Sequence, residues 1–455
     1  MMSETQKTIT FGVGALILAI LALVTAPRIV SPDAFLDRGE PFFPEFNDPN
    51  VARTLSVLEF DEETASARPF QVTNRNGLWI IPSHHNYPAD GADRLAQTAA
   101  GVIGITRDDF RSDNLADHEA LGVLDPSDEA ATSLRGRGTR VTLRGNNEVT
   151  LADFIIGNQV EDRPNFRFVR LPDQKRVYAV RMDINLSTNF SDWIENDLLL
   201  VDQNSINQLV LYDYAIDERT LTINDSDTVT LKKMEGAWTG DGRTSANREI
   251  DSTKVSGLVT AIDGLAIVGV RPKPDGLSSS LQRAAEGGIT RGEVASLQSR
   301  GYYLTRDGDL RSNEGELRVS TTGGILYTLR FGEVLYGTGD VVTAGGESNT
   351  DVDSGPGENR YLFITAEFER DRFPEPRSPL NMDFEGKAAD DLTDEDRANM
   401  DRHENHSEWE AQVLAGEERL VELNARFGPW YYVISSESFE KVRLTREDVT
   451  KEKAN

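Results

Sequence analysis

The hydrophobic positions of this chain begin with one long uncharged run and then break into shorter alternating and helical patterns. Residues 9–26 carry no charge and are almost entirely apolar, which approaches the ~20 residues that a helix needs to cross a bilayer. This pattern predicts a transmembrane helix at 9–26 after a short tail at 1–8, with the lipid bilayer as its partner. A cleaved signal peptide is the alternative, but Pro27 directly follows the small residues Thr25 and Ala26 and disfavours cleavage there.

Charges on the two sides of the apolar run are nearly balanced. Lys7 precedes it, and Arg28 and Arg38 follow it, so the positive-inside rule gives little direction. A short N-terminal tail on the inside and a large exported part is the commonest arrangement. We therefore expect a single-pass protein of the inner (cytoplasmic) membrane with a large extracytoplasmic C-terminal domain, joined to the helix by a stalk at 27–52.

The same succession of patterns then occurs twice, which is the signature of an internal repeat. Each copy has strands around a tryptophan, followed by a helix whose apolar residues fall at helical spacing, at 92–103 in the first copy and 252–265 in the second. Turns rich in Asn and Gly and further strands follow. We therefore predict an α+β fold, a tandem duplication of a mixed module (hairpin, helix, antiparallel strands) after the transmembrane helix. The first repeat covers 53–214 and the second 215–455.

The second copy carries additional sequence at about 339–424. It begins with an acidic, Gly-rich stretch, continues through the Pro-rich FPEPRSP, and ends in a charged segment from Leu392 to Arg426 that is predicted to be helical. Long structured insertions are often where partners bind. A solvated, weakly packed helix is the alternative.

The composition excludes several classes of function. The net charge is −28, and so acidic a surface repels phosphate backbones, which argues against nucleic-acid binding. The chain has no cysteine, which excludes disulfides, thiolate metal sites and cysteine nucleophiles. The sequence contains no P-loop, no GxSxG elbow and no HExxH motif. We therefore predict no catalytic residues and no cofactor.

Aromatic residues recur at matched places in the two copies. Trp79 is matched with Trp238, Trp193 with Trp430, and the strand around Tyr178 with a later strand that contains Tyr361. Because tryptophan buries much area, we favour core anchors over ligand-stacking residues. The alternative is a ligand site in the cleft between the copies, whose candidate residues, if exposed, are Trp79, Tyr87, Trp238 and Tyr302.

Two of the five histidines have a spacing that suits metal binding. His403 and His406 would lie on one helical face, with Glu410 one turn further. A metal site needs three or four ligands and a supporting second shell. We therefore interpret these histidines as a polar helix surface and keep a metal site as the alternative.

Several segments resemble one family over nearly the whole chain after the apolar run. The segments are GEPFFPEFNDP, GLWIIPSHHNYPADGADRLAQTAAGVIGI, DHEALGVLDP, LADFIIGNQV, FSDWIENDLL and the closing LNARFGPWYYVISSESFEKVRLTREDV. They look like the bacterial domain of unknown function 4340 family, in its long, duplicated, membrane-anchored form. The resemblance implies a gene beside the components of a gliding-motility-type ABC transporter. The implied partners are an ABC transporter permease and auxiliary subunits, and no catalytic residue carries over.

The leading hypothesis is therefore a non-enzymatic, membrane-anchored extracytoplasmic accessory protein of an ABC-type transport system. One alternative is an envelope glycan- or peptide-binding module that uses the cleft between the repeats. Another is a hydrolase with an unrecognised site, assisted by a metal at His403 and His406.

Overall fold

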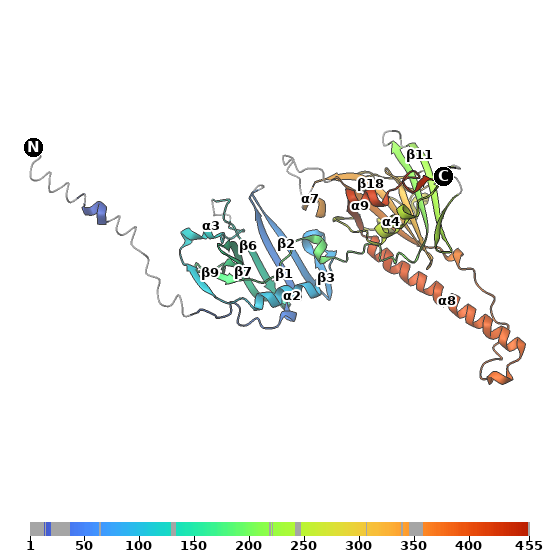
Figure 1. Cartoon of the computed structure of the whole chain (residues 1–455), viewed down its shortest axis with the longest axis horizontal. Coiled ribbons are helices and arrows are strands. Elements are labelled where there is room, and N and C mark those ends of the chain that lie inside the picture. The colour runs from blue at the N-terminus through green and yellow to red at the C-terminus, as the bar shows by residue number, and fades with distance from the viewer. Residues whose placement is uncertain are drawn as a thin grey trace, which may run out of the picture. The chain divides into compact units, whose positions relative to one another are not determined.

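The chain forms two compact units. The computed structural model describes residues 13, 15–19, 37–62, 65–128, 133–217, 220, 222–241, 247–305, 307–337, 340–344 and 358–453. One unit consists of Met1–Arg68 with Leu95–Leu186, and the other of Pro69–Arg94 with Ser187–Asn455. Antiparallel sheets and helices make up both units (Figure 1), which confirms the predicted α+β class.

The predicted membrane helix at 9–26 lies largely outside the described residues. Among the residues that are described, no helix is both long enough and apolar enough to cross a membrane. The predicted stalk is described from residue 37 onward and packs within the first unit, where Phe42 and Phe46 are buried and the rings of Phe42 and Tyr178 meet edge to face at 5.4 Å.

Nine strands form the first sheet, in the order β4-β3-β2-β1-β6-β7-β8-β9-β5. Its strands are β1 (Thr54–Asp61), β2 (Ser66–Arg75), β3 (Leu78–Ile81), β4 (Tyr87–Pro88), β5 (Asp109–Ser112), β6 (Thr139–Arg144), β7 (Thr150–Val160), β8 (Arg163–Arg170) and β9 (Val177–Arg181). The register places alternate apolar residues of β1, β6 and β7 opposite one another, as in Val57–Val141–Phe154. These side chains are all buried, as expected when one period-2 face forms a core.

Helices α2 (Ala92–Ile103) and α3 (His118–Leu121) connect strands of this sheet. α2 has the bounds that the helical spacing predicts. It buries Leu95, Ala99 and Val102, which lie at the helical spacing that predicted the helix.

The second sheet has eight strands in the order β12-β11-β10-β17-β18-β19-β20-β14. They are β10 (Ile206–Asp217), β11 (Thr222–Met234), β12 (Ala237–Gly240), β14 (Gly269–Pro272), β17 (Glu316–Thr321), β18 (Ile325–Tyr336), β19 (Glu358–Phe368) and β20 (Trp430–Ser435). Two-stranded pairs are formed by β13 (Arg248–Ile250) with β21 (Thr450–Glu452) and by β15 (Tyr302–Leu304) with β16 (Leu310–Ser312). The helices are α4 (Ser252–Asp263), α5 (Leu277–Gln282), α6 (Arg291–Gln298), α7 (Asp340–Thr343), α8 (Asp394–Phe427) and α9 (Ser436–Val442).

The two sheets share one order of strands. If β1 is equated with β10, then β2, β3, β5, β6, β7, β8 and β9 correspond to β11, β12, β14, β17, β18, β19 and β20, both along the chain and across the sheet. The predicted boundary between residues 214 and 215 falls inside β10. By sheet position, Tyr178 in β9 corresponds to β20, whereas Tyr361 lies in β19. The sequence match paired these strands differently because a long segment separates β19 from β20.

Matching hairpins begin the two modules. The turn between β2 and β3 is Asn76–Gly77, with φ of 54° and 86°, and the turn between β11 and β12 is Glu235–Gly236, with φ of 50° and 84°. Two successive positive φ values define a type I′ turn, whose twist suits a two-residue hairpin. Trp79 and Trp238 each lie two residues after the glycine.

The predicted insertion at 339–424 contains one strand of the sheet, β19, and then an arm. We define the arm as residues 370–427, in which a mostly extended segment leads back to the start of α8. Figure 1 shows that α8 runs well beyond the second sheet. Only the C-terminal part of α8 buries apolar side chains, namely Val413, Leu423 and Phe427.

Gly416 lets α8 approach β19 closely. A Cβ atom at this position would lie 2.2 Å from the ring of Phe368, far inside van der Waals contact. A larger residue therefore forces either the helix or the ring to move.

We predict that Gly416→Ala lowers the free energy of unfolding by about 1–3 kcal/mol through overpacking. Gly257→Ala is the matched control, because Gly257 lies within α4 and its added Cβ would meet nothing within 4 Å. That control should raise stability by about 0.5–1 kcal/mol through helix propensity. Chemical denaturation of both variants tests the prediction, and a shift of the same sign in both would contradict it.

Candidate functional site

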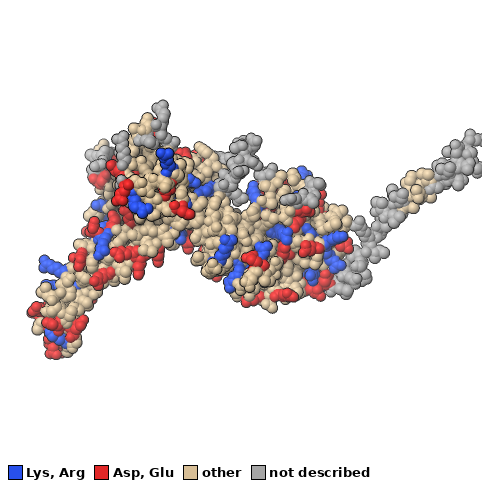
Figure 2. Space-filling model, turned by 180° about the vertical axis from the view of Figure 1, so that it is seen from behind, with Lys and Arg blue, Asp and Glu red and all other residues tan. Residues whose placement is uncertain are grey.

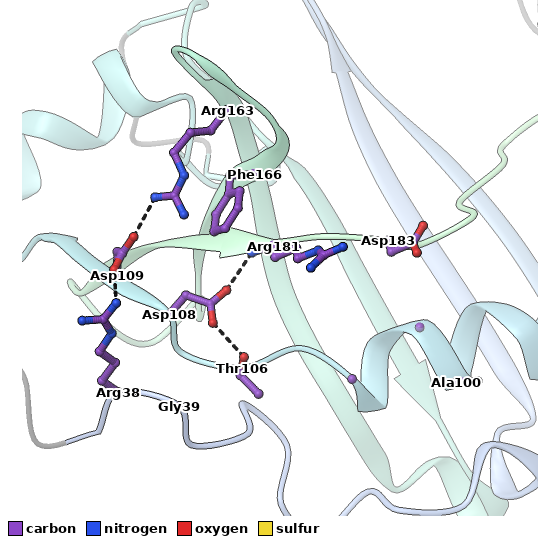
Figure 3. Close-up of a pocket in the computed structure, with 12 residues that line it drawn as sticks. Arg38, Gly39, Ala100, Thr106, Asp108, Asp109, Arg163, Phe166, Arg181 and Asp183 are labelled. Atoms are coloured by element: carbon purple, nitrogen blue, oxygen red, sulfur yellow. Dashed lines mark hydrogen bonds and ion pairs between the residues drawn. The ribbon is translucent and has the colours of Figure 1, made fainter.

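A polar groove of about 540 Å³ lies in the first unit (Figure 3). Four segments that are distant in sequence form it: residues before β1, the C-terminal end of α2 with the loop into β5, the start of β8, and the end of β9. The lining residues are Arg38, Gly39, Ala100, Gly101, Gly104, Thr106, Asp108, Asp109, Arg163, Phe166, Arg181 and Asp183.

Small residues at the end of α2 leave the groove open. A Cβ on Gly101 would lie 3.2 Å from the carbonyl oxygen of Asp183 and 3.3 Å from the side chain of Ile184. Glycine therefore allows the last turns of α2 to lie against the chain as it leaves β9. This close approach brings Asp183 to the side of the groove.

Pairing between β5 and β9 brings the carboxylate of Asp108 to β9. Asp109 pairs with Ala179 in the antiparallel register. Asp108, one residue earlier, accepts a hydrogen bond from the backbone N–H of Arg181 at 2.8 Å. Its other oxygen accepts from the hydroxyl of Thr106 at 2.9 Å. Both oxygens of Asp108 are thus used to hold the wall of the groove.

Asp109 bridges two arginines. One oxygen lies 2.6 Å from the guanidinium of Arg163, and the other lies 3.1 Å from that of Arg38. The Arg163 guanidinium also lies over the ring of Phe166, 3.4 Å from its centroid. All three charged side chains are at least a third exposed, so each ion pair stabilises the fold by only about 0–1 kcal/mol. Their main effect is to fix the positions of the charges.

Two charged side chains of the groove remain available. Within the part of the chain that the structure describes, neither the guanidinium of Arg181 nor the carboxylate of Asp183 has a polar partner, and both residues are exposed. An arginine recognises carboxylate or phosphate groups, whereas a carboxylate accepts from hydroxyl or ammonium groups. Thr106 is the only hydroxyl among the described lining residues. The arrangement therefore suits the binding of a polar ligand.

The sequence candidates for ligand stacking lie elsewhere and differ in exposure. Trp79 and Trp238 are partly exposed on their hairpins, opposite Asn74 and Lys233 respectively. The hypothesis that they bind a ligand stays a prediction.

Tyr302 and Tyr87 are both buried. Tyr302 is fully buried, with its ring 5.4 Å from Phe363 and 6.0 Å from Tyr431. Tyr87 packs edge to face against Phe190 and Trp430 at 5.5 and 5.1 Å. Tyrosine carries much apolar area, and a strand that faces a core buries it.

The matched tryptophans Trp193 and Trp430 also differ. Trp193 is fully buried and donates its indole N–H to the carbonyl of Ser187 at 3.0 Å, as expected of a core anchor. Trp430 is only partly buried.

His403 and His406 face different neighbours. The ring of His403 lies near Phe384, at 5.9 Å. His406 lies 3.4 Å from both Glu375 and Glu410. In the described residues, no three His, Cys, Asp or Glu side chains are grouped closely enough to hold a metal ion.

Groups with strongly shifted pKa values lie outside the groove. Burial lowers the pKa of His84 to about 4, and its ring stacks on Phe190 at 4.6 Å. Burial also lowers the pKa of Lys273 to about 7, with a smaller effect of Arg330. The Lys273 ammonium donates to the carbonyl of Phe427 at 3.0 Å and lies 3.6 Å from the Phe363 ring centroid.

The sequence did not single out any of the groove residues. They come from four segments, and none forms a motif by itself. The one local signal is the charged, apolar, charged order of residues 181–183 (RMD), which predicts that Arg181 and Asp183 point to the same side of a strand.

Lys273 gives a pH-dependent prediction. Its pKa is about 7 in the folded protein and about 10.4 in an unfolded chain. Folding therefore releases a proton between these values, and stability falls as the pH drops from about 10 to 7 and is then constant. Lys273→Met should be more stable than the parent by up to about 5 kcal/mol below pH 7. The difference in stability between Lys273→Met and the parent should become smaller toward pH 10. If the denaturation midpoints of the two proteins differ by the same amount at pH 6 and at pH 10, the prediction is contradicted.

Comparison with known proteins finds one family model that matches part of the chain. The family model described as Domain of unknown function (DUF4340) matches residues 79–281, a little under half of the chain. The matched part runs from β3 to α5 and contains all the groove residues except Arg38 and Gly39. Neither a curated protein nor a solved structure was found to match the chain.

Proposed function

We propose that this chain, whose residues 79–281 match the DUF4340 family model, is a non-enzymatic accessory protein that binds its ligand without transforming it. The observation that carries the proposal is the division of charges in the groove. Asp108 and Asp109 are held by the protein's own donors, whereas Arg181 and Asp183 face an open hollow. Such a site can orient a ligand, but it brings no activated nucleophile to it.

The duplicated architecture supports the same proposal. Two sheets with one strand order and matching type I′ hairpins are what a tandem duplication of an α+β module produces. Repeated modules of this kind supply two related surfaces on one chain, which suits an accessory protein that contacts several subunits.

The proposed setting is the extracytoplasmic side of the inner membrane. The apolar run at 9–26 would anchor the chain, and the family resemblance suggests an ABC transporter permease and auxiliary subunits as partners. A chain with a net charge of −28 remains soluble beside the membrane and is repelled by anionic headgroups.

The transport assignment predicts that the full chain, tagged at its C-terminus and purified from its native membranes in mild detergent, brings with it an ATPase and a permease subunit. Mass spectrometry should identify both in amounts comparable to the chain itself. A version that begins after residue 26 is the control, because it should leave the membrane fraction. Recovery of the intact chain without either subunit would contradict the assignment.

Binding of an envelope glycan or peptide is the second candidate, and the groove favours it specifically. Arg181 suits a carboxylate, Asp183 suits hydroxyl or ammonium groups, and the aromatic Phe166 lies beside Arg163 in the same groove (Figure 3). Cell-wall peptides and their attached sugars carry all three kinds of group. This location, within the first unit, differs from the cleft between repeats that the sequence suggested.

We expect soluble cell-wall muropeptides to raise the unfolding temperature of the parent chain but not that of Arg181→Ala combined with Asp183→Asn. Arg144→Ala is a suitable control, because Arg144 lies on β6, outside the groove, in a long 3.9 Å pair with Glu148. Equal increases of the unfolding temperature in all three proteins would contradict this prediction.

A further inference from the structure

The outer part of the arm is held together without an apolar core. In the first turns of α8 the buried residues are Asp396 and Asn399, both polar. Asp396 closes a capping box with Thr393 and lies 2.7 Å from Lys387. These contacts hold the pKa of Asp396 at about 2. Asn399 accepts from the backbone N–H of Leu380 and donates to Asn381, both at 3.0 Å.

A long helix with little burial is marginal in water, so these polar contacts maintain an extended structure that packing does not require. Carboxylates are spread over the face of the molecule seen in Figure 2, the arm included. The arm therefore presents a defined, charged surface away from the second sheet.

One hollow on this surface has the opposite charge. It measures about 420 Å³ and lies between the extended segment 372–377 and one face of α8. The helix contributes Arg402, Asn405, Trp409 and Gln412, whose spacing of three and four residues places them on one face. The residues that line the hollow are Arg372, Phe373, Pro374, Pro376, Arg377, Arg402, Asn405, Glu408, Trp409 and Gln412.

Of the three arginines that line the hollow, one forms an ion pair within the protein. Arg372 pairs with Glu369 at 2.9 Å. For Arg377 and Arg402, no carboxylate or other polar partner of the guanidinium occurs among the residues described. Glu408 is the single acidic residue that lines the hollow. In a chain with a net charge of −28, this is a local site for an anion.

The floor of the hollow is apolar and fixed in place. The indole N–H of Trp409 donates to the carbonyl of Phe373 at 2.9 Å, which ties the helix to the extended segment. Pro374 and Pro376 restrict that segment to an extended path. A ligand would therefore meet a rigid, elongated surface with an aromatic floor and a guanidinium from each wall.

We propose that this hollow, defined by Arg377, Arg402 and Trp409, binds an acidic, extended segment of a partner protein. Carboxylates of the segment would meet the two free guanidinium groups, and an apolar side chain between them would lie on Trp409. A lipid surface fits less well, because α8 carries ten Asp and Glu residues against four Arg, and these repel anionic headgroups. The proposal concerns the arm alone and does not depend on the groove of the first unit.

Fluorescence anisotropy with the full chain tests this proposal. The probe is a labelled peptide in which glutamates flank a pair of leucines, and a peptide with glutamine in place of glutamate is its neutral counterpart. The parent should bind the acidic peptide, more weakly as salt is added, and should not bind the neutral one. Arg377→Glu combined with Arg402→Glu should weaken binding at least tenfold. Arg397→Glu is the matched control, because Arg397 is an exposed arginine of α8 outside the hollow, and it should bind like the parent.

Three results would overturn the proposal. They are unchanged affinity in the double variant, an equal loss in Arg397→Glu, and binding of the neutral peptide. Vesicles that contain phosphatidylglycerol are tested in a parallel experiment. If they bind the parent through the same two arginines while the peptide does not, the site is one for lipid headgroups and the peptide proposal fails. Circular dichroism at the helix minima confirms that each variant retains α8.

Discussion

The short ladder between β5 and β9 is the constraint on which the candidate site depends. It sets Asp109 opposite Ala179, and this register brings the carboxylate of Asp108 to the backbone N–H of Arg181. In the same register, the side chain of Arg181 points away from Asp108 (Figure 3). A register shift by one residue would turn Arg181 to the other face of the sheet and remove the groove's available cation.

Charge is distributed in the same way at both proposed binding surfaces. In each, ion pairs within the protein hold some of the charged side chains. Asp109 is held by Arg38 and Arg163 in the groove, and at the hollow of the arm Arg372 is held by Glu369. Arginines with free guanidinium groups then remain in hollows rather than on open surface. The overall negative charge of the chain repels anions. Arginines in hollows therefore allow anions to bind, and only at these particular sites.

The sequence predicts the local elements well, because their causes are local. Apolar residues at helical spacing predicted the observed bounds of α2. They also predicted the end of α4 to within two residues. The turns rich in Asn and Gly that were predicted after these helices join β6 to β7 and β17 to β18. The environment of a side chain, by contrast, depends on tertiary contacts. Nothing in the sequence distinguishes the buried Tyr302 from an exposed tyrosine, or the buried Trp193 from the partly exposed Trp430. The groove was missed for the same reason, since its charges meet only when four segments come together.

The central claim is that the groove in the first unit recognises a ligand and leaves it chemically unchanged. Native mass spectrometry of the full chain, released gently from its own membranes, tests this claim most directly. We expect the parent to carry a bound species that Arg181→Glu lacks, and that species should match a compound present intact in the envelope. Identical spectra for the two proteins, or a bound species that is a cleavage product, would contradict the account.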